Sequence, residues 1–218
     1  MTSEPLRIAH RGMPLLAREN TLHSFEMALQ AGADGIELDV HASRDAVVVV
    51  HHDPALDNGL VIARESFDSL RGDRHGDVPE LSEVCALVSG TAELFVEVKG
   101  AGIERQVLEV MDGYDGPFAI HSFDHALVAR IHSIAPKVRL GVLFEELPTD
   151  IAELMTRTGA KDVWPHAPII TSRLVDAVHA ASGRVIAWTV NDVDVARHLS
   201  SIGVDGLCGD DVRLLARG

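Results

Sequence analysis

Two carboxylates and two histidines lie close together in the chain and have the right side chains for metal or acid–base chemistry. Glu37 and Asp39 alternate along a β-branched stretch, and His51 and His52 follow the apolar run Val47–Val50. Side chains two residues apart in a strand point to the same side, so both carboxylates are expected to face one surface. Buried like charges that lie close together repel each other, and a bound cation is the usual remedy. This segment is therefore the first candidate for an active site.

Strands and helices alternate along the chain in a way that positions these groups. Extended segments are predicted at Leu6–His10, Gly35–Val40, Leu94–Val98, Phe118–Ser122, Val138–Leu143, Asp162–Trp164, Val185–Val190 and Val204–Leu207. Helices are predicted at Leu22–Ala31, Leu81–Val88, Ile103–Met111, Ala126–Ile134, Ile151–Thr158, Thr171–Ala181, Val193–Ser200 and Val212–Ala216. Asn20 or Thr21 is expected to cap the first helix. Val47–Val50 is an extra extended piece beside the second strand, and Asp53–Pro79 is predicted to be an irregular excursion outside the core.

Alternating strands and helices imply a parallel sheet. Eight such units in a chain of 218 residues favour an α/β fold of the (β/α)8 TIM-barrel type. The competing doubly wound open sheet usually carries a glycine-rich phosphate loop after its first strand. Here the first turn is His10-Arg11-Gly12-Met13, without that motif, so the barrel is favoured. No linker or change of composition is evident, and residues 1–218 are expected to form one domain.

Polar side chains recur at the carboxyl ends of the predicted strands, where the catalytic groups of a TIM barrel lie. They are His10, Arg11, Glu37, Asp39, Glu97, Lys99, Ser122, Trp164, His166, Trp188, Asn191 and Asp210. Glu97 adds a third carboxylate to Glu37 and Asp39. Three carboxylates suit a hard cation, Mg²⁺ or Ca²⁺, with other positions filled by water or substrate oxygen. A thiolate or multi-histidine zinc site is not indicated.

The remaining rim groups each have a functional and a structural interpretation. Histidines on either side of a phosphate suit acid–base transfer at neutral pH, and His51 and His52 face opposite ways, so only one can point inward. Arg11 has a fork-shaped guanidinium suited to phosphate oxygens, or it pairs with a rim acid such as Glu19 or Asp210. Lys99 binds an anionic oxygen or forms a structural ion pair. Trp188 is either core or a wall of the substrate site.

Composition limits the partners and the compartment. The formal charge of −14 argues against binding to nucleic acid or stable association with anionic membranes. Met1–Leu6 carries an acid and a proline rather than the basic and apolar parts of a signal peptide, and no run is long enough to span a bilayer, so a cytoplasmic location is expected. Cys85 and Cys208 are too few for a disulfide framework and lack metal-site spacing. The oligomeric state is left open.

Nearly the whole chain resembles the glycerophosphodiester phosphodiesterase family, within the phospholipase C-like phosphodiesterases. The matching pieces are His10-Arg11-Gly12, Glu19-Asn20-Thr21, Ser24-Phe25, Gly32-Ala33-Asp34, Glu37-Leu38-Asp39-Val40, His52-Asp53, Glu97-Val98-Lys99, Ser122-Phe123, Trp188-Thr189-Val190-Asn191 and Gly203-Val204-Asp205-Gly206. They occur in the family's order. The chain departs from the family at Asp45-Ala46, where Asp-Gly is usual, at Leu56–Gly59, and at Gly209–Asp211.

The resemblance implies a TIM barrel that hydrolyses a small-molecule glycerophosphodiester to glycerol 3-phosphate and an alcohol. It implies that Glu37, Asp39 and Glu97 hold the divalent cation and that His10 and His52 form the acid–base pair. It thereby selects His52 over His51, and it assigns Arg11 and Lys99 to the phosphate. The departure at Asp45-Ala46 is expected to alter only a turn. The departure at Leu56–Gly59 concerns the leaving-group side of the substrate site, and the departure at Gly209–Asp211 concerns one wall of the pocket.

The expected mechanism uses the substrate's own hydroxyl as nucleophile. The glycerol hydroxyl next to the phosphate, activated by the cation and one histidine, attacks phosphorus while the other histidine protonates the departing alcohol. Water then opens the resulting cyclic phosphate. The sequence leaves open which histidine is the base in the first step.

Two alternatives remain from the sequence. One is a related phosphodiesterase, such as a lysophospholipase D or a phosphoinositide-type phospholipase C, which would favour an exposed apolar lip near the rim. The only such stretch noted, Asn58–Ile62, is short. The other is a barrel that has lost catalysis and binds a phosphorylated metabolite, for which a missing histidine or carboxylate would be expected. The two histidines, His10 and His52, and the three carboxylates are all present.

Overall fold

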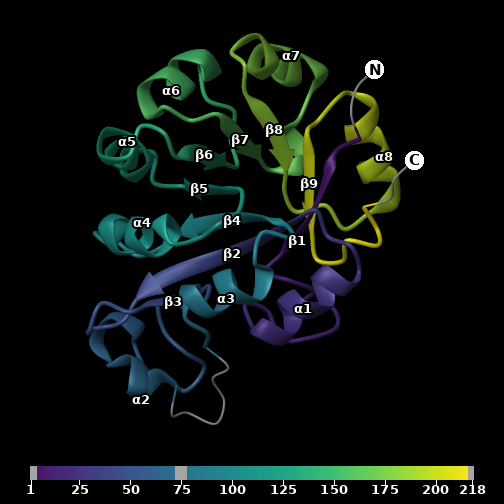
Figure 1. Ribbon diagram of the computed structural model, residues 1–218. Coiled ribbons are helices and arrows are strands. Elements are labelled where there is room, and N and C mark those ends of the chain that lie inside the picture. Colours follow the sequence, from purple (N-terminus) through teal and green to yellow (C-terminus); the bar gives the residue numbers. More distant parts are fainter. Residues whose placement is uncertain (1–3, 72–77, 216–218) are drawn as a thin grey trace.

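A computed structural model describes residues 4–71 and 78–215 and shows a closed barrel of strands surrounded by helices (Figure 1). The barrel strands are all parallel and are β1 (Leu6–His10), β2 (Gly35–Ala42), β4 (Glu93–Val98), β5 (Phe118–Ser122), β6 (Arg139–Phe144), β7 (Asp162–Pro165), β8 (Arg184–Ala187) and β9 (Gly206–Gly209). β1 pairs with both β2 and β9, which closes the sheet. The (β/α)8 prediction is confirmed.

The helices that cover the barrel begin at residues with strong capping side chains. They are α1 (Leu22–Gln30), α3 (Leu81–Val88), α4 (Glu104–Asp112), α5 (His125–Ile134), α6 (Ile151–Thr158), α7 (Ser172–Ala180) and α8 (Val193–Ser201). In five of them the preceding side chain accepts backbone N–H groups of the first turn: Thr21, Asp124, Asp150, Thr171 and Asp192. Thr21 is thus the cap of α1, and Asn20 turns away with a φ of 56° toward the barrel mouth.

Side chains fill the barrel interior in layers. At the amino ends of the strands, Arg184 pairs with Glu93 and Asp162, each at 2.7 Å. Burial would lower the pKa of Arg184, but hydrogen bonds to both carboxylates outweigh it and raise the pKa above its ordinary value. Above this lies an apolar layer formed by Ile8, Phe95, Ala119, Leu143, Trp164, Ile186 and Cys208. The polar groups at the carboxyl ends of the strands therefore lie on a closely packed layer of side chains.

The segment after β2 has more structure than the sequence predicted. β3 (Val48–Val50) pairs antiparallel with β2, and η1 (Ile62–Arg64) and α2 (Phe67–Arg71) follow. Their buried side chains form a separate cluster of Val49, Leu56, Ile62, Phe67, Leu70 and Val78. The described part of Asp53–Pro79 is an excursion from the barrel, as predicted, but the sequence did not reveal its small separate core, because its apolar residues are spaced too irregularly to show a period. Gly72 and Gly76 lie outside the described residues.

Two predicted elements near the carboxyl terminus also differ. The last strand is β9, two residues later than predicted, because Gly206 packs between Ile8 and Ile186 inside the barrel despite its low strand propensity. Val212–Leu215 forms a turn rather than the start of a helix, and Ala216 lies outside the described residues. Asp211 stabilises that turn by accepting from the backbone N–H and guanidinium of Arg213. No helix in the described part of the chain combines the length and apolar character needed to cross a membrane.

Candidate active site

A pocket of about 180 Å³ lies at the carboxyl ends of the barrel strands. Its lining contains seven of the eight side chains to which a function was assigned from the sequence: His10, Arg11, Glu37, His52, Glu97, Lys99 and Trp188. His121, Phe123, Leu143, Glu145, Trp164 and Cys208 complete the wall. The strands of the barrel therefore bring together groups that are far apart in the sequence, as the predicted fold requires.

A buried group at the base of the pocket combines Glu37, Glu97 and His121. One possible ligand atom from each lies within 4.8 Å of the others. Glu97 faces His121 across the β4–β5 register, and the ring of His121 stacks on Trp164 with centroids 4.4 Å apart. Neither ring nitrogen of the fully buried His121 has a hydrogen-bond partner.

Burial dominates the electrostatics of Glu97 in this group. Burial and the negative charge of Asp39 raise the pKa of Glu97 to about 7. Nζ of Lys99 lies 2.9 Å from the Glu97 carboxylate and its charge lowers the pKa, but burial and the negative charge of Asp39 outweigh this effect. Nε2 of His121 lies 3.7 Å from a carboxylate oxygen of Glu37, too far for a hydrogen bond. Two carboxylates and an imidazole without a hydrogen-bond partner are a suitable donor set for a divalent cation.

Asp39 lies beside this group but is bound to other side chains. Its carboxylate is 3.1 Å from Nε of Arg11 and 3.4 Å from Nζ of Lys99, and it accepts a 2.8 Å hydrogen bond from Asn20. Burial would raise the pKa of Asp39, but the charges of Arg11 and Lys99 outweigh it and lower the pKa below its ordinary value. Asp39 thus holds both basic groups of the pocket in place.

Both predicted acid–base histidines are held by carboxylates through Nδ1. Nδ1 of His10 is 2.7 Å from Asp210, and Nδ1 of His52 is 2.8 Å from Asp53, which leaves Nε2 of each ring available for proton transfer. Burial lowers the pKa of His10, but the hydrogen bond to Asp210 and the charge of Glu37 outweigh it, so the net pKa is raised.

His51, the competitor of His52, does not line the pocket, and its Nδ1 donates to the backbone carbonyl of Asp53. The structure therefore brings His52 rather than His51 to the candidate site. The two rings separate because successive side chains of an extended segment alternate in direction.

Arg11 occupies a strained turn at the pocket edge. Its φ is 55°, and Gly12 follows with a φ of 89°, where an added Cβ would lie 2.3 Å from Oγ of Ser24. The Arg11 guanidinium contacts Glu19 as well as Asp39, so the structural alternative of a rim ion pair is realised with Glu19. Asp210, the other acid considered for Arg11, hydrogen-bonds to His10 and Asn191.

Aromatic side chains form the outer wall of the pocket. Trp188 lies edge-on to Phe123 with ring centroids 5.4 Å apart, and its indole N–H donates to the carbonyl of Trp164. Lys99 lies 5.8 Å from the Phe123 ring centroid. Trp164 is fully buried in the layer below. Ser122 hydrogen-bonds to the backbone of Val98 and does not line the pocket.

Sequence reasoning missed His121 and the pairing of His10 with Asp210. His121 is a single polar residue within an otherwise apolar strand, two residues after Ala119, and its parity already placed it on the interior side. The alternation of side chains along this strand could therefore have identified His121 as a residue of the site. The His10–Asp210 hydrogen bond joins residues 200 positions apart and depends on closure of the barrel between β1 and β9.

The chain is similar to known proteins over nearly its whole length. Residues 10–214 match the model of the "Glycerophosphoryl diester phosphodiesterase family". A "probable glycerophosphodiester phosphodiesterase 1" of Mycobacterium tuberculosis is 31% identical and matches 94% of this chain and 88% of its own length. A glycerophosphodiester phosphodiesterase of Bacillus altitudinis is 30% identical, with 93% of each chain covered.

Solved structures show the same fold. An Oleispira antarctica phosphodiesterase in complex with the product sn-glycerol-3-phosphate has a TM-score of 0.90 and 26% identity, covering 97% of this chain and 95% of its own. A glycerophosphodiester phosphodiesterase from Thermotoga maritima has a TM-score of 0.88 and 25% identity, covering 97% of each chain. With the family model matching nearly its full length, this chain belongs to the glycerophosphoryl diester phosphodiesterase family.

Proposed function

We propose that this chain hydrolyses glycerophosphodiesters to sn-glycerol 3-phosphate and an alcohol, with a divalent cation as cofactor. The observation that carries the proposal is one pocket in which two carboxylate-held histidines, two basic groups and the buried Glu37–Glu97–His121 group meet. The names of the relatives and the product in the Oleispira antarctica structure support the same reaction.

Glu37, Asp39 and Glu97 are the carboxylates proposed to hold Mg²⁺ or Ca²⁺, and His121 joins them as a fourth candidate. The raised pKa of Glu97 and the lack of hydrogen-bond partners for the ring nitrogens of His121 support this set. When bound, such a cation supplies Lewis acidity toward a phosphate oxygen and lowers the pKa of a neighbouring hydroxyl. Asp39 contributes in either case, because it holds Arg11 and Lys99.

His10 and His52 are the proposed proton-transfer groups. One removes the proton from the glycerol hydroxyl next to the phosphate, and the other protonates the oxygen of the leaving alcohol. A new bond forms from the glycerol oxygen to phosphorus as the bond to the alcohol oxygen breaks, which yields a cyclic glycerol phosphate. Water then adds to phosphorus, the ring opens, and the two histidines exchange roles.

Arg11, Lys99 and Trp188 are proposed to bind the substrate. The two cations stabilise the negative charge that grows on the phosphate oxygens in the transition state. Their own positions are fixed by Asp39, so no reorganisation is required at the moment of reaction. Trp188 forms an apolar wall next to the reacting group.

The test is release of glycerol 3-phosphate from glycerophosphocholine by the purified full chain. EDTA should abolish it, and Mg²⁺ or Ca²⁺ should restore it. His10→Ala and His52→Ala should each lower kcat by at least about 10²-fold, the usual contribution of acid–base groups.

His51→Ala is the matched control, because this ring lies one residue away and outside the pocket. It should retain near-normal activity. Near-full activity of both His10→Ala and His52→Ala would refute the histidine assignment, and EDTA-insensitive turnover would refute the metal. Binding of glycerol 3-phosphate without any turnover would instead favour the non-catalytic alternative.

A further inference from the structure

A polar side chain in the loop after β8 contacts the carboxylate that holds His10. Asn191 hydrogen-bonds to Asp210 twice: its amide Nδ2 donates to Oδ2 at 2.6 Å, and its Oδ1 accepts from the Asp210 backbone N–H at 2.9 Å. Within the described part of the chain, the Asn191 side chain makes no other hydrogen bond. Oδ1 of Asp210 is left to accept from Nδ1 of His10 at 2.7 Å. A chain of hydrogen bonds therefore runs from Asn191 to a proposed proton-transfer group.

The two bonds from Asn191 close a ring that fixes the Asp210 carboxylate relative to its own backbone. A single bond would leave the carboxylate free to turn about its side-chain torsion angles, whereas a donor at Oδ2 and an acceptor at the backbone N–H fix both ends. Burial would raise the pKa of Asp210, but the hydrogen bonds from His10 and Asn191 contribute to lowering the pKa below its ordinary value. The ionised carboxylate can only accept, so Nδ1 of His10 carries a proton.

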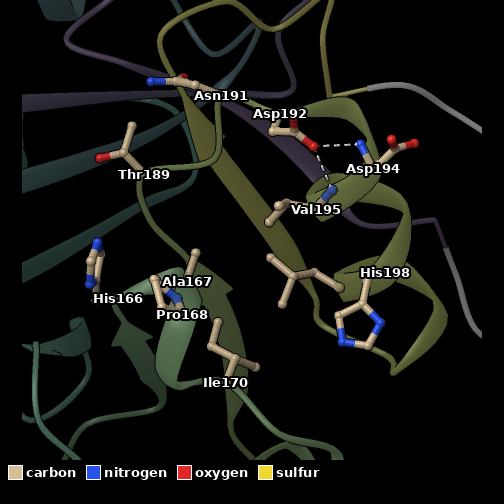
Figure 2. A pocket seen from close by; sticks show the side chains of 11 residues that line it. His166, Ala167, Pro168, Ile170, Thr189, Asn191, Asp192, Asp194, Val195 and His198 are labelled. Atoms are coloured by element: carbon tan, nitrogen blue, oxygen red, sulfur yellow. Dashed lines mark hydrogen bonds between the residues drawn. The ribbon is translucent and has the colours of Figure 1, made fainter.

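Asn191 is itself held between two fixed neighbours. Val190 is buried, and its backbone N–H donates to the carbonyl of Cys208 in β9. Asp192 caps α8 by accepting from two backbone N–H groups of the first turn (Figure 2). Gly209 allows the close approach of β9 to this loop, because an added Cβ would lie 2.1 Å from the carbonyl oxygen of Val190. Asn191 is thereby placed beside the residue that follows Gly209.

The other proposed proton-transfer histidine has no such support. Asp53 accepts from His52 at 2.8 Å, its side chain is 69% exposed, and no second side chain among the described residues hydrogen-bonds to its carboxylate. Because Asp53 directly follows His52, local geometry alone brings this pair together. Asp210 lies 200 positions from His10, so its orientation depends on contacts with other parts of the chain.

From these observations we propose that Asn191 is a positioning residue, which holds Asp210 in the orientation that keeps the proton on Nδ1 of His10 and leaves Nε2 available to the substrate. This inference rests on the proposed function, because Asn191 acts through a proposed proton-transfer group. Asn191 does not line the active-site pocket, so its effect is on the chemical step rather than on substrate binding. The inference also gives a role to Gly209–Asp211, where the chain departs from the family.

The test is Asn191→Ala, with kcat and KM for glycerophosphocholine measured separately. The side chain is exposed and borders a groove of about 730 Å³, so its removal leaves no buried cavity. kcat should fall about three- to tenfold, the contribution of a partly exposed hydrogen bond to a charged group. KM should change less than about twofold, because Asn191 does not line the pocket.

Thr189→Ala is the matched control. Thr189 lies in the same loop and borders the same groove, but its side chain makes no hydrogen bond to the described residues. Its kcat should match that of the unaltered protein.

A double-mutant cycle separates positioning from a structural role in the loop. In an Asp210→Ala background, Asn191→Ala should lower kcat by less than about twofold, because the carboxylate through which Asn191 acts is already gone. A purely structural role would give the same loss in both backgrounds.

Exchange of the Nδ1 proton of His10 with solvent, followed by NMR without substrate, is a readout that does not depend on turnover. It should be about three- to tenfold faster in Asn191→Ala than in Thr189→Ala, because the acceptor of this proton is less firmly held.

The outcomes separate this inference from the proposed function. An unchanged kcat in Asn191→Ala would overturn the positioning role alone, and so would an equal loss with and without the Asp210 carboxylate. Equal proton exchange in Asn191→Ala and Thr189→Ala would do the same. Absence of turnover in the unaltered protein would overturn the proposed function and, with it, the catalytic role of Asn191.

Discussion

Asp210→Asn should lower the pKa of His10 and should lower kcat/KM by about tenfold. Asp210 accepts a hydrogen bond from Nδ1 of His10 at 2.7 Å, and the two side chains are only 21% and 18% exposed. A hydrogen bond to a charged group contributes about 1.5–3 kcal/mol and a neutral one about 1 kcal/mol. The isosteric amide can keep the neutral bond, so about 1.4 kcal/mol of imidazolium stabilisation is lost, which is a factor of about ten in an equilibrium constant.

The assay is kcat/KM for glycerophosphocholine as a function of pH, which reports the pKa values of the free enzyme's acid and base. Because the imidazolium is less stable in the variant, the limb governed by His10 should move to lower pH. If the acidic limb moves, His10 is the base of the first step, and if the basic limb moves, His10 is the acid. The same profile therefore settles the role that the sequence left open.

Asp53→Asn provides a matched comparison on the other histidine. Its bond to His52 is similar, at 2.8 Å, but the Asp53 side chain is 69% exposed. Solvent screening reduces the contribution of exposed pairs to a fraction of that of buried ones. The loss of kcat/KM in Asp53→Asn, expressed as a free energy, should be less than half of that in Asp210→Asn. Equal losses of kcat/KM in the two variants, or no pH shift in Asp210→Asn, would refute the argument from burial.

Further predictions concern stability and the proposed metal site. Ala46 is exposed with a φ of 66°, so Ala46→Gly should raise the free energy of unfolding by about 0.5–1 kcal/mol in urea titrations. Gly12→Ala should lower it by more than about 2 kcal/mol, since the new Cβ would overlap Ser24, and a stable variant would contradict the contact. Glu97→Gln and His121→Gln should each weaken Ca²⁺ binding at least about tenfold in calorimetry, while Ser122→Ala should not. The lowered pKa of Asp39 means that its stabilising effect is present above the unfolded pKa of about 3.9 and is lost as the pH falls through the folded pKa. Asp39→Asn should therefore cost about 3 kcal/mol at pH 7 and show a weaker loss of stability between pH 5 and pH 3, measured by urea unfolding at each pH.

Much of the barrel could be predicted because the sequence signals of its strands and helices lie within a few neighbouring residues. The alternation of apolar residues in each strand, the caps such as Thr21 and Asp192, and the pairing of polar residues with strand ends are all set within a few positions. Prediction failed for elements whose position depends on contacts between residues far apart in the sequence. Gly206 is part of β9 because of Ile8 and Ile186, and the segment after β3 has a core of its own that no period reveals.

The candidate site divides in the same way. The sequence by itself determined that Glu37 and Asp39 face the same side of one strand and that Glu97 and Lys99 face the same side near the end of the next barrel strand, since side-chain parity is a local property of an extended chain. Only the tertiary structure decided the partners. The β4–β5 register placed His121 opposite Glu97, and closure of β1 on β9 brought Asp210 to His10. Register and closure are fixed by packing across the whole barrel, and a linear sequence does not contain them in readable form.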